Sequence, residues 1–281
     1  MASRSSYTVS TPQKQTGDSP LRLSSRDSIQ HPAQSLVFSR SPKGYVVDVK
    51  RLGKFEISDD GQLTNYEAYT SDNMLVEGFI IGNIEPLLLS LRGHIVLHAS
   101  VVLVGKSAVA LMGPSGYGKT SVSTALLMHG CKLLSDDACR VEHGNNGSEA
   151  APFQPYLSVP NSNPFIKSLG EVIHDGSLKK WMRVKDELFH DSPAPLTVIY
   201  NLKRGKTLHI KPLQGARAVQ ALLRNTYRSA SIFDMEKLYG EMQTLATLVE
   251  DGLDVRSLYI PRGWNYVRRA AGMILRDVAE N

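Results

Sequence analysis

The stretch Gly113-Pro114-Ser115-Gly116-Tyr117-Gly118-Lys119-Thr120 decides how the rest of this sequence is interpreted. It matches the pattern G-x-x-x-x-G-K-[ST] at every fixed position. An apolar, β-type run over 108–112 precedes it, and residues 119–129 follow with helical periodicity, with Gly130 as a C-terminal cap. A strand, a glycine-rich loop and a helix in this order predict a loop whose backbone N–H groups surround phosphate.

The residue types in this loop suit a nucleoside triphosphate, ATP or GTP. Lys119 would reach the β- and γ-phosphates, and the hydroxyl of Thr120 would ligate Mg²⁺. The predicted nucleotide-binding residues are Gly113, Pro114, Ser115, Gly116, Tyr117, Gly118, Lys119, Thr120 and Ser121. The alternative is a glycine-rich turn that only joins a strand to a helix. The complete motif together with its context favours the phosphate site.

Two adjacent carboxylates, Asp136 and Asp137, follow the next predicted strand, at 131–134. A carboxylate at such a strand end holds Mg²⁺ beside a phosphate loop, and a second can take a proton from an attacking hydroxyl. We assign Thr120 and Asp136 to the metal, although the sequence does not separate the roles of the two aspartates. The alternative is a solvated turn, because Ser-Asp-Asp is common turn chemistry.

His98 lies one predicted strand earlier, in Leu97-His98-Ala99-Ser100. A histidine inside an apolar run is as readily a hydrogen-bonded core residue as a catalytic one. Both interpretations stay open from the residues alone.

Three segments together resemble the catalytic core of the HPr kinase/phosphorylase family: 97–100, 113–120 and 133–137. That family is a branch of the P-loop kinases related to ATP-dependent phosphoenolpyruvate carboxykinase. The resemblance covers residues 93–142 well and the rest of 43–281 in outline. It implies an α/β fold with a mixed sheet flanked by helices and a short N-terminal β segment.

The resemblance also implies an activity, the transfer of a phosphoryl group to a serine of a peptide or small protein. Carried over by position, Lys119 and Thr120 bind phosphate and Mg²⁺, Asp136 and Asp137 supply the metal contact and the base, and His98 lies near the acceptor. The chain is most similar to diverged members that phosphorylate the C-terminal serine of lasso-peptide precursors. Members of the family form homo-oligomers, which we therefore also expect.

The sequence departs from the family in lacking its second signature, a glycine-containing strand segment preceded by Glu and Arg. The phosphorylase back-reaction and HPr as substrate are therefore not expected. Two other functions remain as alternatives: a small-molecule kinase or simple NTPase, and a nucleotide-sensing module without chemistry.

Composition divides the chain into a tail and a globular part. Residues 1–42 are rich in Ser, Thr, Gln, Arg and Pro and carry five bases against two acids, so we expect a disordered tail. Residues 43–281 carry 27 bases against 25 acids. The net charge of +5 is thus largely a property of the tail and does not indicate a nucleic-acid partner. We expect an N-terminal β lead-in at 43–92 and a catalytic core at 93–281.

The cysteine count and the length of the apolar runs indicate the cellular compartment. Two cysteines, Cys131 and Cys139, are too few for a disulfide framework and lack zinc-site spacing, so a reduced, cytoplasmic compartment is expected. Apolar runs are all shorter than 18 residues, so no membrane span is expected.

Three basic residues are candidates for the acceptor site. Arg224 and Arg228 fall four apart on one face of a helix predicted at 216–227, where a solvated basic stripe is the commoner explanation. Lys185 follows a Pro-rich segment and is a similar candidate.

The remaining secondary structure is predicted from periodicity. Strands are expected at 45–49, 54–57, 94–98, 101–104, 139–141, 196–202 and 207–213, the last two paired with each other. Residues 78–91 are expected to form a strand and then a helix, and further helices are expected at 166–173, 177–181, 233–250 and 264–278.

Overall fold

The structure is a computed structural model that describes residues 36–144, 147–176, 178–227 and 235–280. It divides into two compact units, at Gly93/His94. We expect a disordered tail at 1–42, and residues 1–35 of it lie outside the described residues. Its expected end at residue 42 is wrong, because Leu36–Ser41 forms strand β1 and pairs in antiparallel fashion with β2.

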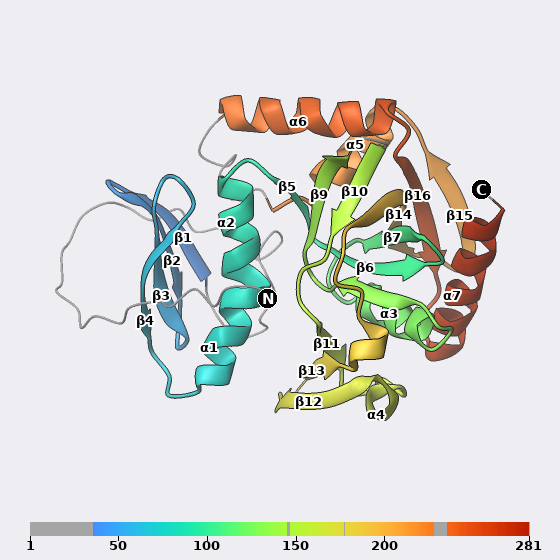
Figure 1. Cartoon of the computed structure of the whole chain (residues 1–281), viewed down its shortest axis with the longest axis horizontal. Helices are drawn as coiled ribbons and strands as arrows, with labels where there is room; N and C mark the ends of the chain where they lie inside the picture. Colours follow the sequence, from blue (N-terminus) through green and yellow to red (C-terminus); the bar gives the residue numbers. More distant parts are fainter. Residues whose placement is uncertain (1–35, 145–146, 177, 228–234, 281) are drawn as a thin grey trace. The chain divides into compact units, whose positions relative to one another are not determined.

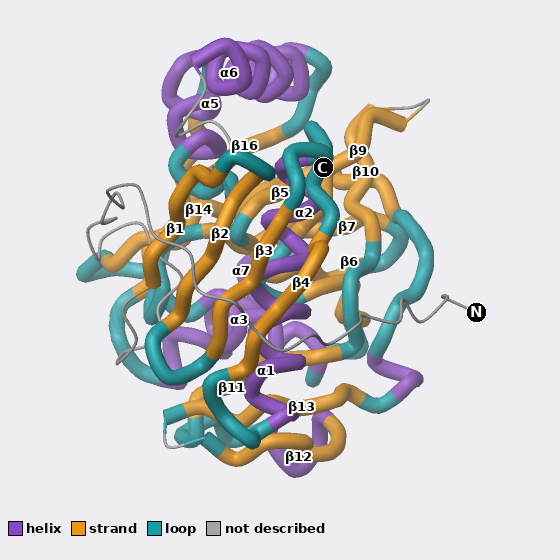
Figure 2. The backbone as a smooth tube through the Cα atoms, turned by 90° about the vertical axis from the view of Figure 1, so that its left-hand side faces the viewer, coloured by secondary structure: helices purple, strands orange, loops and turns teal. Residues whose placement is uncertain are grey.

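The N-terminal unit is an antiparallel sheet followed by one long helical segment. The sheet has the order β1-β2-β3-β4, whose strands run side by side in Figure 2. Its strands are β1 (Leu36–Ser41), β2 (Gly44–Val49), β3 (Gly53–Ile57) and β4 (Leu63–Ala68), and its helical segments are α1 (Asn73–Phe79), the π-helical turn η1 (Ile80–Ile84) and α2 (Glu85–Leu91). The expected N-terminal β segment is confirmed.

The strand expected at the start of 78–91 is wrong, because the whole segment is helical. Asp72 caps the first helix by accepting a hydrogen bond from the N–H of Leu75 at 3.0 Å. The buried residues Val76, Phe79, Ile84, Leu87, Leu88 and Leu91 recur at helical spacing. Phe79 stacks on Phe55 of the sheet with ring centroids 5.3 Å apart. Continuous apolar character concealed the helical period.

The helix over Asn73–Leu91 has 19 residues and a mean hydropathy of 1.5, which by length and composition alone would let it cross a membrane. Half (50%) of the most apolar 18-residue window of this helix is buried. This is weak support for a span, because buried core helices of soluble proteins pass the same test.

The C-terminal unit is built on a mixed, nine-stranded sheet flanked by helices, as expected from the sequence (Figure 1). Its strands are β5 (Ile95–Leu97), β6 (Ala99–Val104), β7 (Ser107–Met112), β8 (Lys132–Ser135), β9 (Cys139–Gly144), β10 (Gly147–Ala151), β14 (Ala194–Arg204), β15 (His209–Leu213) and β16 (Asp254–Ile260). The helices are α3 (Lys119–Leu127), α5 (Ala216–Leu223), α6 (Met235–Glu250) and α7 (Trp264–Ala279).

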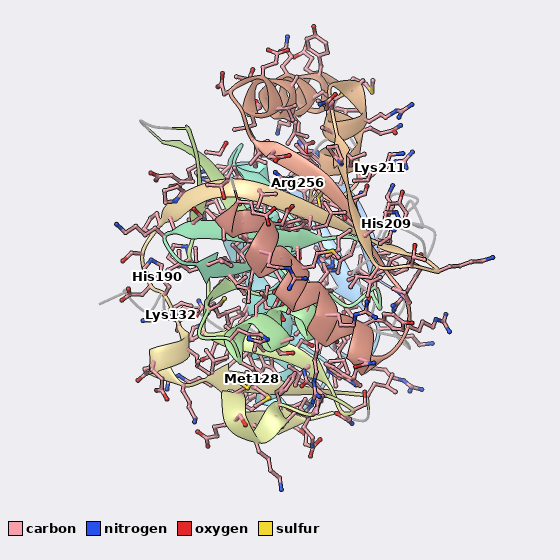
Figure 3. The ribbon with its side chains drawn as sticks, turned by 90° about the vertical axis from the view of Figure 1, so that its right-hand side faces the viewer. Met128, Lys132, His190, His209, Lys211 and Arg256 are labelled. Atoms are coloured by element: carbon pink, nitrogen blue, oxygen red, sulfur yellow. The ribbon has the colours of Figure 1, made fainter. Side chains whose placement is uncertain are left out.

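Alternation along β7 separates two cores. Val109 and Leu111 pack with α3 and α7, while Ala108, Ala110 and Met112 pack with α5 and α6. Figure 3 shows α7 crossing one face of the sheet, with Arg256 on the neighbouring strand β16. The strand that enters the phosphate loop is therefore buried on both faces, which makes a rigid base for the loop.

A small second sheet, with the order β11-β13-β12, packs beside α3. It consists of β11 (Tyr156–Pro160), β12 (Gly170–Asp175) and β13 (Lys179–Val184), with helix α4 (Ile166–Leu169) and the 3₁₀ turn η2 (Asp186–Leu188) at its margins. The helices expected at 166–173 and 177–181 are therefore wrong beyond Leu169. A Cβ at Gly170 would lie 2.0 Å from the carbonyl oxygen of Arg183, so glycine permits this close strand pairing.

The pairing expected between 196–202 and 207–213 is also wrong. Strand β16, which the sequence analysis missed, lies between them, parallel to β14 and antiparallel to β15. Local sequence favours a hairpin, but a strand that comes some 50 residues later takes the central position.

The helix expected at 264–278 is confirmed as α7. Cys131 and Cys139 are both buried and free.

Candidate active site

The phosphate-loop motif joins β7 to α3, so the predicted order of strand, loop and helix is confirmed. Gly113, Gly116 and Gly118 all have positive φ angles, of 135°, 77° and 104°. A Cβ on Gly113 would lie 2.9 Å from the carbonyl oxygen of Leu202 on β14, which excludes larger residues there. Gly118 is the N-cap of α3 and offers no side chain to its first turn, leaving those N–H groups for another acceptor.

Lys119 is buried, with 6% of its surface exposed, and its ammonium group has two neighbours. Nζ donates to the carbonyl oxygen of Gly113 at 2.8 Å and to Nε2 of His98 at 3.0 Å. Burial lowers the pKa of Lys119, while the charges of Asp137 and Asp136 raise it. The lysine is thus pre-positioned at the loop and held by neutral acceptors that a phosphate can replace.

The ring of His98 carries its proton on Nδ1. An ammonium group can only donate, so Nε2 must accept from Lys119. Nδ1 lies 2.9 Å from the carbonyl oxygen of Asp137, which can only accept. Burial, followed by the charge of Lys119, lowers the pKa of His98 and favours this neutral form. Of the two interpretations left open, the structure shows a hydrogen-bonded residue that also contacts the phosphate-loop lysine.

Asp136 lies beside Thr120, as predicted. Strands β7 and β8 are both antiparallel to β6, so they end at the same edge of the sheet. Thr120 Oγ1 lies 3.2 Å from each carboxylate oxygen of Asp136, and the N–H of Ser158 donates to one of them at 3.1 Å. Burial and the charge of Asp137 raise the pKa of Asp136 to about 6. A hydroxyl and a carboxylate together are the oxygen donors that Mg²⁺ prefers, so this pair fits the metal.

Asp137 differs from its neighbour in backbone and in contacts. Its φ is 63°, in the left-handed region that few non-glycine residues adopt. Its carbonyl oxygen accepts from Nδ1 of His98 and from the hydroxyl of Tyr227, each at 2.9 Å. Within the described part of the chain its carboxylate makes no hydrogen bond, which leaves this group available to an incoming hydroxyl.

The structure brings together five of the predicted side chains, and none of the described contacts joins Arg224 or Lys185 to them. His98, Lys119, Thr120, Asp136 and Asp137 share one edge of the sheet. Helix α5 ends at Leu223, so the helix face expected to carry Arg224 is not formed beyond its C-cap, and Arg228 lies outside the described residues. Lys185 is exposed beside the turn η2. The helix prediction failed because Asn225 and Tyr227 hydrogen-bond to the strand segment around His98.

Sequence reasoning missed several residues of this site. Arg204, at the end of β14, donates to the carbonyl oxygen of Gly116 and lies over the ring of Tyr117, 5.4 Å from its centroid. The charge of Lys179, on β13, acts on the pKa of Asp136 and Lys119. The parallel pairing of β14 with β7 is what brings Arg204 to the loop, and no local pattern predicts that pairing.

Comparison with protein-family models and with curated proteins finds no match to this chain. Among solved structures, the Hpr(Ser) kinase/phosphatase from Coxiella burnetii aligns with 66% of this chain and 97% of its own. The sequence identity is 13% and the TM-score is 0.38. At these values the alignment assigns neither an activity nor a site residue to this chain.

Proposed function

We propose that the chain is a Mg²⁺-dependent kinase that transfers the terminal phosphoryl group of ATP or GTP to a serine hydroxyl of a peptide or small protein. The observation that carries this proposal is the 3.2 Å contact of Thr120 Oγ1 with both carboxylate oxygens of Asp136, in the same loop as the buried Lys119. A phosphate loop alone binds nucleotide. Thr120 and Asp136 together offer oxygen ligands for Mg²⁺, and the carboxylate of Asp137 follows in the chain. This combination supports phosphoryl transfer from the bound nucleotide.

The two aspartates divide the work in this proposal. Asp136 is hydrogen-bonded on both oxygens and belongs with Thr120 at the metal, which neutralises phosphate charge when bound. Asp137 is the base: its carboxylate accepts the proton of the serine hydroxyl as the oxygen attacks the γ-phosphorus. The bond from phosphorus to the bridging oxygen breaks, and the nucleoside diphosphate leaves with that electron pair. Lys119 holds the phosphate oxygens throughout.

The acceptor follows from the resemblance and not from the geometry. We propose a cytoplasmic enzyme acting on a peptide, with the C-terminal serine of a lasso-peptide precursor as the first candidate. We also propose that the enzyme forms a homo-oligomer. We propose neither a nucleic-acid partner nor a membrane partner.

The test is mass spectrometry of a mixture of serine-terminated and serine-free peptides after incubation with the chain, MgATP and separately MgGTP. A gain of one phosphoryl unit on serine peptides supports the proposal, provided that Lys119→Ala abolishes it. Free phosphate without a modified peptide would indicate an NTPase or a small-molecule kinase. Tight nucleotide binding without any phosphate release, unchanged in Asp137→Asn, would indicate a sensing module. Either of the last two results rejects the serine kinase.

A further inference from the structure

Asp137 is one of two non-glycine residues with positive φ in the described part of the chain. Aspartate tolerates this region better than most residues, but the conformation still persists only where its surroundings hold it. The same backbone angle sets the direction of the carboxylate. Whatever holds the Asp137 peptide therefore also aims the proposed base.

Two side chains hold that peptide through a single atom. The carbonyl oxygen of Asp137 accepts at 2.9 Å from Nδ1 of His98 and at 2.9 Å from the hydroxyl of Tyr227. A carbonyl oxygen has two lone pairs, so the protein supplies a donor for each. The two rings meet edge to face, with centroids 5.8 Å apart and an interplanar angle of 75°. Neither ring can shift far without displacing the other.

The backbone around Tyr227 is fixed to the strand segment that carries His98. The N–H of His98 donates to the carbonyl of Asn225 at 2.6 Å, and the N–H of Tyr227 donates to the carbonyl of Val96 at 2.9 Å. Asn225 is in turn tied to helix α5 by a 2.8 Å hydrogen bond to the carbonyl of Ala221. Burial and the nearby carboxylates raise the pKa of Tyr227 well above its usual value, so its hydroxyl keeps its proton.

These contacts form a continuous chain from the phosphate loop to the proposed base. Lys119 donates to His98, His98 donates to the Asp137 carbonyl, and Tyr227 donates to the same oxygen. Placement within a fraction of an ångström is what such a base requires. Tyr227 supplies the second donor to this oxygen and so adds a constraint on the peptide that His98 alone would not give.

We infer that Tyr227 is a positioning residue for phosphoryl transfer, which fixes the left-handed backbone of Asp137 through its carbonyl oxygen and so aims the carboxylate at the acceptor hydroxyl. The inference rests on the proposed function for the role of Asp137 as base. The two hydrogen bonds from His98 and Tyr227 to the Asp137 carbonyl oxygen, which we call the clamp, are present in the unliganded protein.

The test is Tyr227→Phe, which removes one hydroxyl and keeps the ring. We expect faster hydrogen–deuterium exchange in the peptide covering 133–139 of the unliganded protein. With MgATP and acceptor, kcat should fall by about 10- to 100-fold, while the Kd for MgATP changes less than about twofold. The matched control is Tyr200→Phe, whose hydroxyl donates to Asp277 on α7, away from the site. It should lower stability and leave both exchange at 133–139 and kcat unchanged.

Three results would overturn the inference. They are an unchanged kcat in Tyr227→Phe, unchanged hydrogen–deuterium exchange at 133–139 in that variant, or a loss of kcat in Tyr200→Phe as large as in Tyr227→Phe. Failure of the proposed function has a different signature. If the wild type neither binds nor uses MgATP, but Tyr227→Phe loosens 133–139, the clamp stands and the kinase is rejected.

Discussion

Nζ of Lys119 donates a 3.0 Å hydrogen bond to Nε2 of His98, which links the phosphate-loop lysine to a residue one strand away. In Leu97-His98-Ala99-Ser100 a core histidine and a functional one were equally good interpretations. The contact shows why: the ring is partly buried and hydrogen-bonded, and it is also a partner of the lysine. A buried ammonium needs acceptors, and the histidine supplies one when no phosphate is bound.

His98 is expected to be neutral, with its proton on Nδ1, and to titrate below the usual value of 6.5, because burial and the charge of Lys119 lower its pKa. Nitrogen-15 NMR of the ring over a pH series measures both properties. Binding of MgATP should alter the Nε2 signal, because phosphate draws Lys119 away. A proton on Nε2, or titration above 6.5, would show that the hydrogen-bond chain is wrongly assigned.

The two aspartates should respond differently to the same substitution. Asp136→Asn should weaken Mg²⁺ binding about tenfold or more, because it removes charge next to Thr120. Asp137→Asn should leave Mg²⁺ affinity nearly unchanged and lower kcat by about two to four orders of magnitude, because the base is lost. Mg²⁺ titration of turnover separates the two effects. Equal effects of both variants on Mg²⁺ affinity would reject this division of roles.

Asp136 should be a source of instability in the metal-free protein. Its folded-state pKa, about 6, lies above the ordinary value of 3.8, because burial and Asp137 penalise its charge. The charge therefore costs stability above pH 6, and the cost disappears as the pH falls towards 3.8. Asp136→Asn should raise the free energy of unfolding without metal by about 1–3 kcal/mol at pH 7.5.

Denaturant unfolding at pH 7.5 and at pH 5 measures this effect, and the gain should be smaller at pH 5. Asp137→Asn, for comparison, also removes a negative charge beside Asp136, so it should give part of the same gain. A less stable Asp136→Asn protein at pH 7.5 would contradict the expectation.

Two glycines of the loop should differ in their tolerance of alanine. Gly113→Ala places a Cβ 2.9 Å from the Leu202 carbonyl oxygen at φ 135°, whereas Gly118→Ala meets nothing within 4 Å at φ 104°. The second change should cost about 1–2 kcal/mol in backbone strain, and the first should cost more, because a main-chain atom of β14 must also move. Urea unfolding compares them directly. Equal losses would mean that the contact with Leu202 does not constrain the loop.

The sequence predicted the part of the site that depends on local chemistry. Motif and spacing predict the phosphate-loop residues, the hydroxyl of Thr120 and the aspartates after β8. These residues lie at one edge of the sheet because β7 and β8 are both antiparallel to β6. Periodicity failed where neighbours distant in the sequence decide the structure, as for β16 between β14 and β15.

The same limit explains the residues that were missed. Tyr227 was read as part of a helix, but its segment pairs with the strand segment before His98. Arg204 reaches Gly116 because β14 lies parallel to β7. Long-range pairing of this kind leaves no periodic signal in either segment.

Binding of nucleotide phosphate by residues 113–120 can be measured by calorimetric titration of MgATP into the wild type and Lys119→Ala. We expect saturable binding to a single site in the wild type and loss of that binding in the variant, with both proteins equally folded by circular dichroism. No binding to the wild type, or the same affinity in both proteins, would contradict it.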